Sequence, residues 1–413
     1  MHLLHRTQIS PEIKVHTSIN KIANPLFATS TFSFSLLLIT LFLLLLTGCS
    51  DNNTVDSNTT SEFDPKATFR FDTFGDEALW TDVLRWNEVV TTVDPVTALS
   101  VGLKVDSEVL PAEILDTADL TSPETTLALL KLDAIVGIKA TVEDDGTVSK
   151  FGVTCALCHS TVDDSVAPGI GKRLDGWPAR DLNPGLIISL SPFFDDKLDQ
   201  RAVLQSWGTG KFDPYWNMDG ISDPVLIAPA YGLKDVPLET YTGEGPVSFW
   251  NSYIAVTQMG GQGNFQNDHL NLNIQVAKDL VTPKLPALLA YQNSLEPPTP
   301  PQGSFDADAA IRGKAIFEGK ATCASCHSGE TYTDAGTTLH DAFETGSDPI
   351  YATRGATGQY RTTPLKGAWQ HPPYFHNGAH ATLLDLVDHY DIILATGLLD
   401  KEKSDLVEFL KSL

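Results

Sequence analysis

The chain has 413 residues, of which 42% are apolar and 19% charged, with 30 glycines and 25 prolines. This composition can form a hydrophobic core and excludes a chain that is disordered throughout, and the length suggests two domains. Acidic residues outnumber basic ones by 52 to 28, which gives a formal net charge of −24. Because nucleic-acid binding needs clustered basic residues, this charge excludes nucleic acid as a partner.

The first fifty residues have the features of a targeting segment. Residues 31–47 are apolar and rich in serine and threonine, Lys14 and Lys21 precede them, and a Gly-Cys pair follows at Cys49. This pattern resembles a bacterial lipoprotein signal, so we expect residues 1–48 to be removed and Cys49 to carry lipid. The alternative is an uncleaved membrane anchor, although spanning a bilayer takes about 20 apolar residues. The expected product is an exported lipoprotein that faces the periplasm at the inner or outer membrane.

Two polar segments divide the rest of the chain. Residues 49–62 contain almost no apolar side chains and are predicted to form a flexible tether. Four prolines lie in the segment 296–305, and because proline fixes φ and lacks an N–H, this segment is predicted to be a stiff linker. We therefore expect an N-terminal domain at residues 63–295, with an extra helical segment, and a C-terminal domain at residues 306–413.

Apolar spacing predicts a mostly α-helical fold. After the linker, Asp306 or Asp308 can cap a helix that runs to Phe317, and residues 405–413 place apolar side chains at i, i+3, i+4 and i+7. Gly313 would let these two helices approach closely. Helical spacing also occurs at residues 76–92, 124–136 and 270–294. Alternation typical of strands is scarce, and the remainder reads as loops rich in glycine and proline.

Cysteine is rare, and its placement is the most informative feature of the sequence. Four of the five cysteines lie in two identical Cys-x-x-Cys-His frames, at residues 155–159 and 323–327. This spacing places two thiols so that each can add to a vinyl group of one porphyrin while the adjacent histidine faces the iron. We therefore predict two covalently bound haem c groups. The attachment and iron-ligating residues are Cys155, Cys158 and His159 in the first motif and Cys323, Cys326 and His327 in the second.

The competing interpretation of the two motifs is a Cys₄ zinc site, which uses the same cysteine pairs. Three observations oppose zinc. Each pair is followed at once by histidine, the chain is expected to be exported to a compartment where haem is attached, and the pairs are much further apart than the ~15–20 residues of a zinc ribbon.

The function of such a haem depends on the sixth coordination position of the iron. A second strong ligand makes an electron-transfer haem, whereas an open position lets the iron react with peroxide or O₂. The candidate ligands that remain are Met218, Met259, His269, His340, His371, His376, His380 and His389.

At this point the sequence resembles a known family, the bacterial dihaem cytochrome c peroxidases. The segments that carry the resemblance are Gly313-Lys-Ala-Ile-Phe-Glu-Gly, Cys323-Ala-Ser-Cys-His-Ser-Gly, Arg361-Thr-Thr-Pro-Leu-Lys-Gly and Pro373-Tyr-Phe-His-Asn-Gly. The similarity runs from the linker to about residue 394. Before the linker it is limited to the first Cys-x-x-Cys-His motif and Phe249-Trp250, and residues 63–150 have no counterpart.

The resemblance implies two cytochrome c-type haem domains with long loops, and roles for individual residues. Electrons from a small donor protein would enter at the C-terminal haem, Trp250 would relay them, and the N-terminal haem would act on peroxide or another oxidant. His376 would lie near the second haem and the contact between the domains. Tyr390 falls where the peroxidases place a methionine ligand, which is similar to the methylamine-utilisation branch of the family. The alternative is that Tyr390 is a core residue and that His340, His371 or His380 is the ligand.

Several family residues are missing, and their absence puts peroxidase activity in doubt. Asp175 stands at the spacing where the peroxidases have a histidine that caps the first haem. After Trp250 the chain offers Gln258 and Gln262, which we predict to be catalytic together with Trp250, and also Met259. The glutamate that would act as general acid is absent there. The first haem is therefore either capped by Met259 (or Met218) or open, and we predict that it is at least partly high-spin.

The resemblance also implies a calcium ion between the domains, held partly by the main-chain carbonyls of His371 and Pro373. Because Ile227 replaces the expected side-chain oxygen before Pro229, calcium stays an open alternative. The predicted function is a peroxidase-like dihaem oxidoreductase. The alternatives are a non-enzymatic dihaem electron carrier and a haem oxygenase that acts on an apolar substrate.

Overall fold

Short helices, many of them started by an acidic or amide side chain followed by proline, make up most of the regular secondary structure of the described residues. The computed structural model describes residues 62–413, without the side chains of residues 115 and 116. Asp64, Asp94, Asn183 and Asp348 each accept a hydrogen bond from a backbone N–H of the helix that follows, and proline occupies the first turn of each of these helices. Because proline has a helical φ and no N–H to leave unpaired, this combination begins a helix efficiently.

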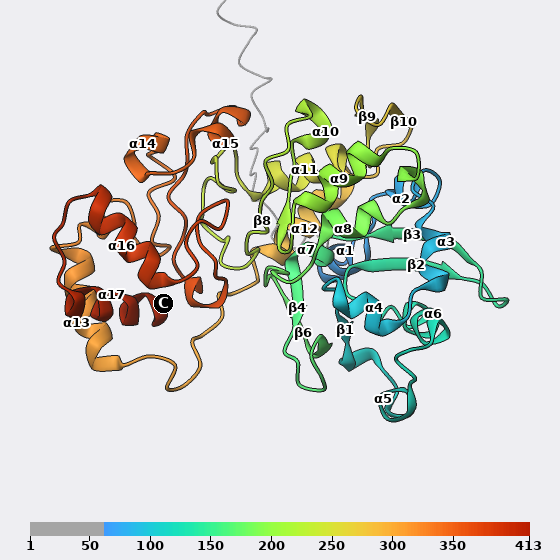
Figure 1. The fold of residues 1–413 in the computed structure, drawn as a ribbon, viewed down its shortest axis with the longest axis horizontal. Helices are drawn as coiled ribbons and strands as arrows, with labels where there is room; N and C mark the ends of the chain where they lie inside the picture. The colour runs from blue at the N-terminus through green and yellow to red at the C-terminus, as the bar shows by residue number, and fades with distance from the viewer. Residues whose placement is uncertain (1–61) are drawn as a thin grey trace, which may run out of the picture. The chain divides into compact units, whose positions relative to one another are not determined.

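The helices before the linker are α1 (Pro65–Phe71), α2 (Glu77–Trp80), α3 (Trp86–Val89), α4 (Pro95–Ser100), α5 (Ala112–Thr117), α6 (Pro123–Lys131), α7 (Ala156–His159), α8 (Pro184–Ser189), α9 (Leu198–Ser206), α10 (Trp216–Asp219), α11 (Val247–Thr257) and α12 (Leu285–Gln292) (Figure 1). The helices after the linker are α13 (Ala307–Glu318), α14 (Ala342–Thr345), α15 (Pro349–Arg354), α16 (Leu383–Ile393) and α17 (Asp400–Lys411). Single 3₁₀ turns form η1 (Val90–Thr92), η2 (Ser107–Val109), η3 (Pro192–Phe194), η4 (Thr282–Lys284), η5 (Cys323–Ser325) and η6 (Ala368–Gln370).

The strands of the described part form two-stranded sheets. The antiparallel pairs are β2 (Ile138–Val142) with β3 (Val148–Val153), β4 (Ser160–Val162) with β6 (Arg173–Asp175), β7 (Lys211–Phe212) with β8 (Val225–Leu226), and β9 (Gly263–Asn267) with β10 (Leu272–Val276). The parallel pair is β1 (Val105–Asp106) with β5 (Ile170–Gly171). The prediction of a mostly α-helical protein is therefore confirmed, with small sheets added to the part before the linker.

One of the three helical predictions before the linker is wrong in its first half. Residues 272–276 form β10 of a hairpin with β9, and the helix α12 begins only at Leu285. The reason is that Leu272, Ile274 and Val276 alternate with polar residues, which is the two-residue period of a strand. The segment 76–92 is also interrupted, because Arg85 has a left-handed φ of 56° between α2 and α3.

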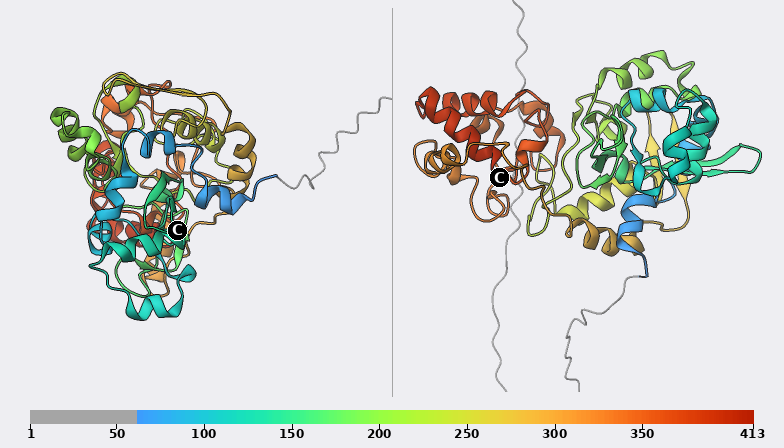
Figure 2. Two further views of the ribbon diagram at one scale, coloured as in Figure 1. Left: turned by 90° about the vertical axis from the view of Figure 1, so that its right-hand side faces the viewer. Right: turned by 90° about the horizontal axis from the view of Figure 1, so that it is seen from below.

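The pairing of the first and last helices of the C-terminal part agrees with the sequence prediction. Asp306 caps α13 by accepting a hydrogen bond from Ala309 N at 3.0 Å, and α13 packs along α17 (Figures 1 and 2). A Cβ atom on Gly313 would lie 2.0 Å from the backbone oxygen of Asp405. Only glycine therefore allows this close helix crossing, and Arg312 reinforces it with hydrogen bonds of 2.9 and 2.8 Å to Asp405.

The parts before and after the linker contact each other through buried polar groups, and residues 62–413 belong to one compact unit. The Arg354 side chain, which is 2% exposed, pairs with Asp213 at 2.9 Å and Asp219 at 2.8 Å. It also donates to the main-chain oxygens of Ile221 and Asp223. The two parts are thus joined by contacts far from the linker, while the domain boundaries themselves stay a prediction.

The predicted lipoprotein signal and nearly all of the tether, residues 1–61, lie outside the described residues. Within residues 62–413, every helix is too short or too polar to cross a bilayer.

Candidate haem sites

The histidine of the first motif is oriented by a main-chain hydrogen bond. The motif lies at α7, and the Nδ1 atom of His159 is 3.0 Å from the carbonyl oxygen of Ala228. Because a carbonyl can only accept, Nδ1 carries the proton and Nε2 keeps its lone pair. Burial lowers the pKa of His159, so the ring is neutral. A neutral imidazole with a free Nε2 is the form that binds a metal.

The histidine of the second motif has the same arrangement, although its local structure differs. Cys323 begins the turn η5, and the Nδ1 atom of His327 is 3.0 Å from the carbonyl oxygen of Tyr332. Burial lowers the pKa of His327 as well. Two segments that lie 168 positions apart in the chain thus orient their histidines in the same way, as is needed to bind iron.

A cavity of about 600 Å³ lies beside the second motif, and its size is within the ~300–1,000 Å³ typical of cofactor sites. Cys323, Cys326 and His327 line it. Its apolar wall comes from α13, α16 and α17 through Phe317, Leu383, Leu386, Val387, Leu406 and Leu410. A histidine beside two thiols that face a cavity with an apolar wall is the chemistry that a covalently attached porphyrin requires, so these residues fit haem c.

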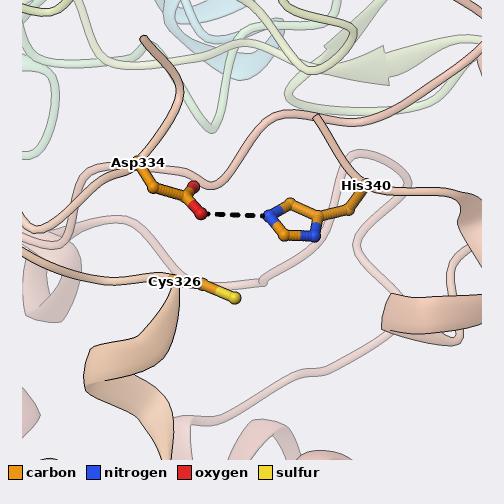
Figure 3. A group of neighbouring side chains, drawn as sticks. All are labelled: Cys326, Asp334 and His340. Atoms are coloured by element: carbon orange, nitrogen blue, oxygen red, sulfur yellow. Dashed lines mark ion pairs between the residues drawn. The ribbon is translucent and has the colours of Figure 1, made fainter. Parts of the chain in front are cut away.

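The four cysteines of the motifs do not form a zinc site in the described chain. The group of side chains close enough to share a metal ion contains only one of them, Cys326, with Asp334 and His340. Figure 3 shows Asp334 and His340 facing each other, with His340 Nε2 3.4 Å from Asp334 Oδ2. The other ring nitrogen of His340 is 3.1 Å from Glu344. If Cys326 forms a thioether, the Asp334–His340 pair is left at the edge of the cavity.

Tyr390, the predicted ligand of the second haem, lines the same cavity as His327. Burial, and then the nearby Cys326 and Cys323, raise the pKa of Tyr390 to about 12. The alternative ligands His340 and His371 also line this cavity, and His376 does so too. His380 instead packs against the His389 ring, with the ring centres 4.6 Å apart. The structure thus brings Tyr390 to the second motif, and its role as a ligand stays a prediction.

Met259, the predicted ligand of the first haem, lies in a buried apolar cluster with Phe69, Ala156 and Ala255, against which Cys155 packs. It is therefore next to the first motif. Met218 is 62% exposed, which does not fit the ligand role considered for it.

Two of the three polar residues considered at the first site, Gln258 and Asp175, are held by other groups. Gln258 donates hydrogen bonds to Pro214 and Asn217, both at 2.9 Å, while Gln262 is half-buried. Asp175, which replaces the family histidine, is bound by Arg70 at 2.6 Å and Arg173 at 3.0 Å. In this network Asp175 is a structural carboxylate. The catalytic roles predicted for Gln258 and Gln262 stay predictions.

Trp250 lies in α11 at the contact between the two parts of the protein. It is buried, and its indole N–H has no hydrogen-bond partner among the described residues. Ring-centre distances of 6.4, 5.8, 5.3 and 5.0 Å connect Trp250, Tyr215, Tyr351, His376 and Tyr360 in that order. The last two rings line the cavity of the second motif. A continuous row of aromatic side chains therefore leads from Trp250 to that cavity.

Sequence reasoning found two members of this row, Trp250 and His376, and missed Tyr215, Tyr351 and Tyr360. The three tyrosines lie in three separate segments of the chain, and no motif joins them. Their only sequence signal is that they are tyrosines near polar, glycine-containing loops, which does not predict contact.

Comparison with known proteins gives distant relatives. No protein-family model matches the chain. A cytochrome-c peroxidase, IdrP1 of Pseudomonas sp. strain SCT, is 29% identical over 149 residues, which covers 25% of this chain and 39% of that protein. The methylamine utilization protein MauG of Methylorubrum extorquens strain AM1 is 31% identical over 133 residues, covering 27% of this chain and 36% of that protein. The chain has distant, partial homology to the dihaem family of these proteins.

Among solved structures, hydrazine synthase of Kuenenia stuttgartiensis matches with a TM-score of 0.31 and 22% identity, covering 50% of this chain and 74% of that one. A MauG-like protein associated with microbial copper homeostasis matches with a TM-score of 0.26 and 20% identity, covering 34% and 58%. Neither value is high enough to bear on the fold or the function of this chain.

Proposed function

We propose that this protein is a dihaem c-type oxidoreductase of the peroxidase type, in which electrons from a small donor protein enter at the C-terminal haem and reach an oxidant such as peroxide at the N-terminal haem. The observation that carries the proposal is the matched preparation of His159 and His327, each with Nδ1 hydrogen-bonded to a carbonyl and each next to a cysteine pair. The distant homology to a cytochrome-c peroxidase and to MauG supports it.

The residues that would hold the two haems are the six of the motifs. Cys155, Cys158 and His159 would hold the first, and Cys323, Cys326 and His327 the second. When bound, haem c supplies reversible one-electron chemistry and, where a coordination position is open, a site for a small oxidant. The apolar walls from α16 and α17 would exclude water from the second site.

The aromatic row from Trp250 to His376 and Tyr360 supports transfer of electrons between the two parts. Neighbouring rings with centres 5.0–6.4 Å apart provide π systems at close intervals across this contact. The acidic surface, with a net charge of −24, suits a small donor protein with a basic face.

The proposal also assigns the sixth ligand of each iron. Tyr390 would bind the second iron, because it is half-buried and lines the cavity of the second motif. Met259 would bind the first iron, because it is buried beside its motif. A phenolate favours the ferric state more than a thioether does, so Tyr390 would lower the reduction potential of the second haem.

The position of Met259 also favours a second candidate function, a dihaem electron carrier without enzymatic activity. If Met259 occupies the sixth position of the first iron at all times, no position is open to peroxide. The predicted export and lipid attachment at Cys49 are compatible with both functions, because c-type haem is attached outside the cytoplasm.

The number of covalently bound haems tests the proposal directly. The protein produced in a bacterium with a haem-attachment system should have an intact mass increased by two haem c groups, and it should stain for haem after denaturing electrophoresis. The Cys155→Ser/Cys158→Ser and Cys323→Ser/Cys326→Ser variants should each lose one haem. A protein that carries no covalent haem, or a mass that does not change in these variants, would contradict the proposal.

A further inference from the structure

Arg180 is a partly buried arginine without an acidic partner. Each of the other seven arginines in residues 62–413 forms an ion pair with an aspartate or glutamate. Arg180 forms none, although acidic residues outnumber basic ones by almost two to one in this chain. Its Nε and Nη1 atoms are buried without a hydrogen-bond partner in the described protein, and Nη2 is 3.4 Å from Nδ1 of His371.

An unpaired guanidinium at such a place is energetically unfavourable, because it loses hydration without gaining a counter-charge. The neighbouring His371 does not supply the missing negative charge. Burial and the nearby Arg180 lower the pKa of His371 to about 3, so the imidazole is neutral. The described protein therefore leaves a positive charge and the N–H groups of two guanidinium nitrogens for a partner that is not part of this chain.

Arg180 lines the same cavity as Cys323, Cys326 and His327. The hydroxyl groups of the neighbouring tyrosines already donate their protons to main-chain carbonyls, so they do not compete with Arg180 for an anion that enters the cavity. Tyr231 donates to Gly367 O at 3.0 Å, Tyr241 to Leu226 O at 3.1 Å and Tyr374 to Ala368 O at 3.0 Å. Arg361, which also lines the cavity, is already paired with Glu239. Lys234 and Lys366 also line the cavity, but both are exposed to solvent. Among the described residues that line the cavity, Arg180 is thus the half-buried cation without an acidic partner.

We propose that Arg180 binds a carboxylate of the group that occupies this cavity, namely a propionate of the porphyrin attached to Cys323 and Cys326. This inference rests on the proposed function. A guanidinium presents a planar fork of N–H donors that matches both oxygens of a carboxylate. A porphyrin also has its acidic groups at one edge and an apolar body, which matches a cavity with apolar walls near His327 and a cation at Arg180.

If Arg180 binds the propionate, both parts of the protein contact one cofactor. Arg180 precedes the linker, whereas the attachment cysteines follow it. Arg180 is therefore a positioning residue that would fix the porphyrin edge from the opposite part of the protein. Its positive charge would also favour the reduced iron, because it offsets the negative charge of the propionate.

The test uses the full protein with its haems, in the Arg180→Gln and Arg180→Lys variants. Arg85→Gln is the matched control, because Arg85 is exposed and pairs only with Glu88 at the surface. We expect Arg180→Gln to keep two haems, to shift a propionate bending band in the resonance Raman spectrum and to lower the midpoint potential of one haem. Arg180→Lys, which keeps the charge without the fork, should shift the band and largely keep the potential. Arg85→Gln should change neither.

The outcomes separate this inference from the proposed function. A wild-type protein with fewer than two haems contradicts the proposed function. Two haems in Arg180→Gln with an unchanged Raman band and unchanged potentials overturn the role of Arg180. If wild-type protein binds acetate in a calorimetric titration and Arg180→Gln does not, the partner is a free anion, which also overturns the inference. If Arg180→Gln does not fold, the propionate Raman band of Arg180→Lys still tests the role of Arg180, and an unchanged band in this variant overturns it.

Discussion

At the scale of single residues, the protein prepares its histidines through main-chain carbonyls. His159 and His327 each use Nδ1 to bind a carbonyl oxygen, which fixes the tautomer and leaves Nε2 for a metal. The side chains predicted to complete the iron coordination are of a different kind. Met259 and Tyr390 reach the motifs from other segments of the chain, so their positions depend on packing and not on the motif.

Replacement of Met259 tests ligation of the first haem. If the Met259 thioether binds iron, Met259→Ala should convert the low-spin fraction of one haem to high-spin, because an alanine supplies no ligand. The EPR and absorption spectra of the oxidised protein report this change, and peroxide should then react faster with the variant. Met218→Ala, at the exposed methionine, is the control and should leave the spectra unchanged. Identical spectra of Met259→Ala and wild type would remove Met259 from the coordination sphere.

At the scale of elements, the crossing of α13 and α17 forms the frame of the second site. Gly313 allows the backbones to touch, and Asp405 of α17 receives two hydrogen bonds from Arg312 of α13. Phe317 from one helix and Leu406 and Leu410 from the other then line the cavity. The close crossing of the two helices therefore places the side chains that form this wall of the candidate haem pocket.

The ion pair between these helices predicts a stability that depends on pH. The hydrogen bonds from Arg312 hold the pKa of Asp405 down at about 2, below the ~3.9 of an unfolded aspartate. A lowered pKa in the folded state stabilises the protein above pH ~4, and this contribution is lost as the pH falls towards 2, because the unfolded chain takes up the proton first.

We therefore expect the free energy of unfolding of Asp405→Asn to fall less steeply than that of wild type between pH 4 and 2, and to be lower at neutral pH. Denaturant titrations at several pH values measure both effects. Asp400→Asn, at an exposed position of the same helix, controls for the loss of one carboxylate. Parallel pH profiles for wild type and Asp405→Asn would contradict the role of this pair.

At the scale of the whole molecule, the two parts of the described chain are coupled by buried charge and by aromatic rings at the same place. Arg354 binds Asp213 and Asp219 from the other part. Its guanidinium also lies 5.3 Å from the ring centre of Tyr215 and 5.9 Å from that of Tyr351. Arg354 therefore contacts Tyr215 and Tyr351, the neighbouring rings at which the aromatic row passes from one part of the protein to the other.

Removal of this salt bridge should lower the stability of the protein and slow electron transfer between the two parts. Arg354→Ala leaves Asp213 as an unpaired buried charge, which typically costs ~3–5 kcal/mol. We expect lower stability in denaturant titrations and faster hydrogen exchange in residues 213–223. We also expect slower equilibration of electrons between the two haems after rapid reduction of one. Arg85→Ala, which breaks a surface pair, should change none of these. Unchanged exchange in residues 213–223 would show that Arg354 does not join the parts.

The sequence was sufficient for features that depend on neighbouring residues, and it was insufficient for those that depend on packing. Local spacing predicted the motif histidines, the cap at Asp306 and the close approach at Gly313. It failed at residues 272–276, where a strand period was read as part of a helix. It also placed Met218 among the candidate ligands, although this side chain is exposed.

By itself, the sequence determined the two Cys-x-x-Cys-His frames, and from them we predict two attached porphyrins, because the covalent chemistry needs cysteines and a histidine at fixed short spacing. Only the tertiary structure decided what surrounds them. Arg180 lacks an acid, three tyrosines connect Trp250 to the second cavity, and Arg354 meets Asp213 across 141 positions of the chain. These contacts depend on burial and charge in the folded protein, so the spacing of residues along the chain does not predict them.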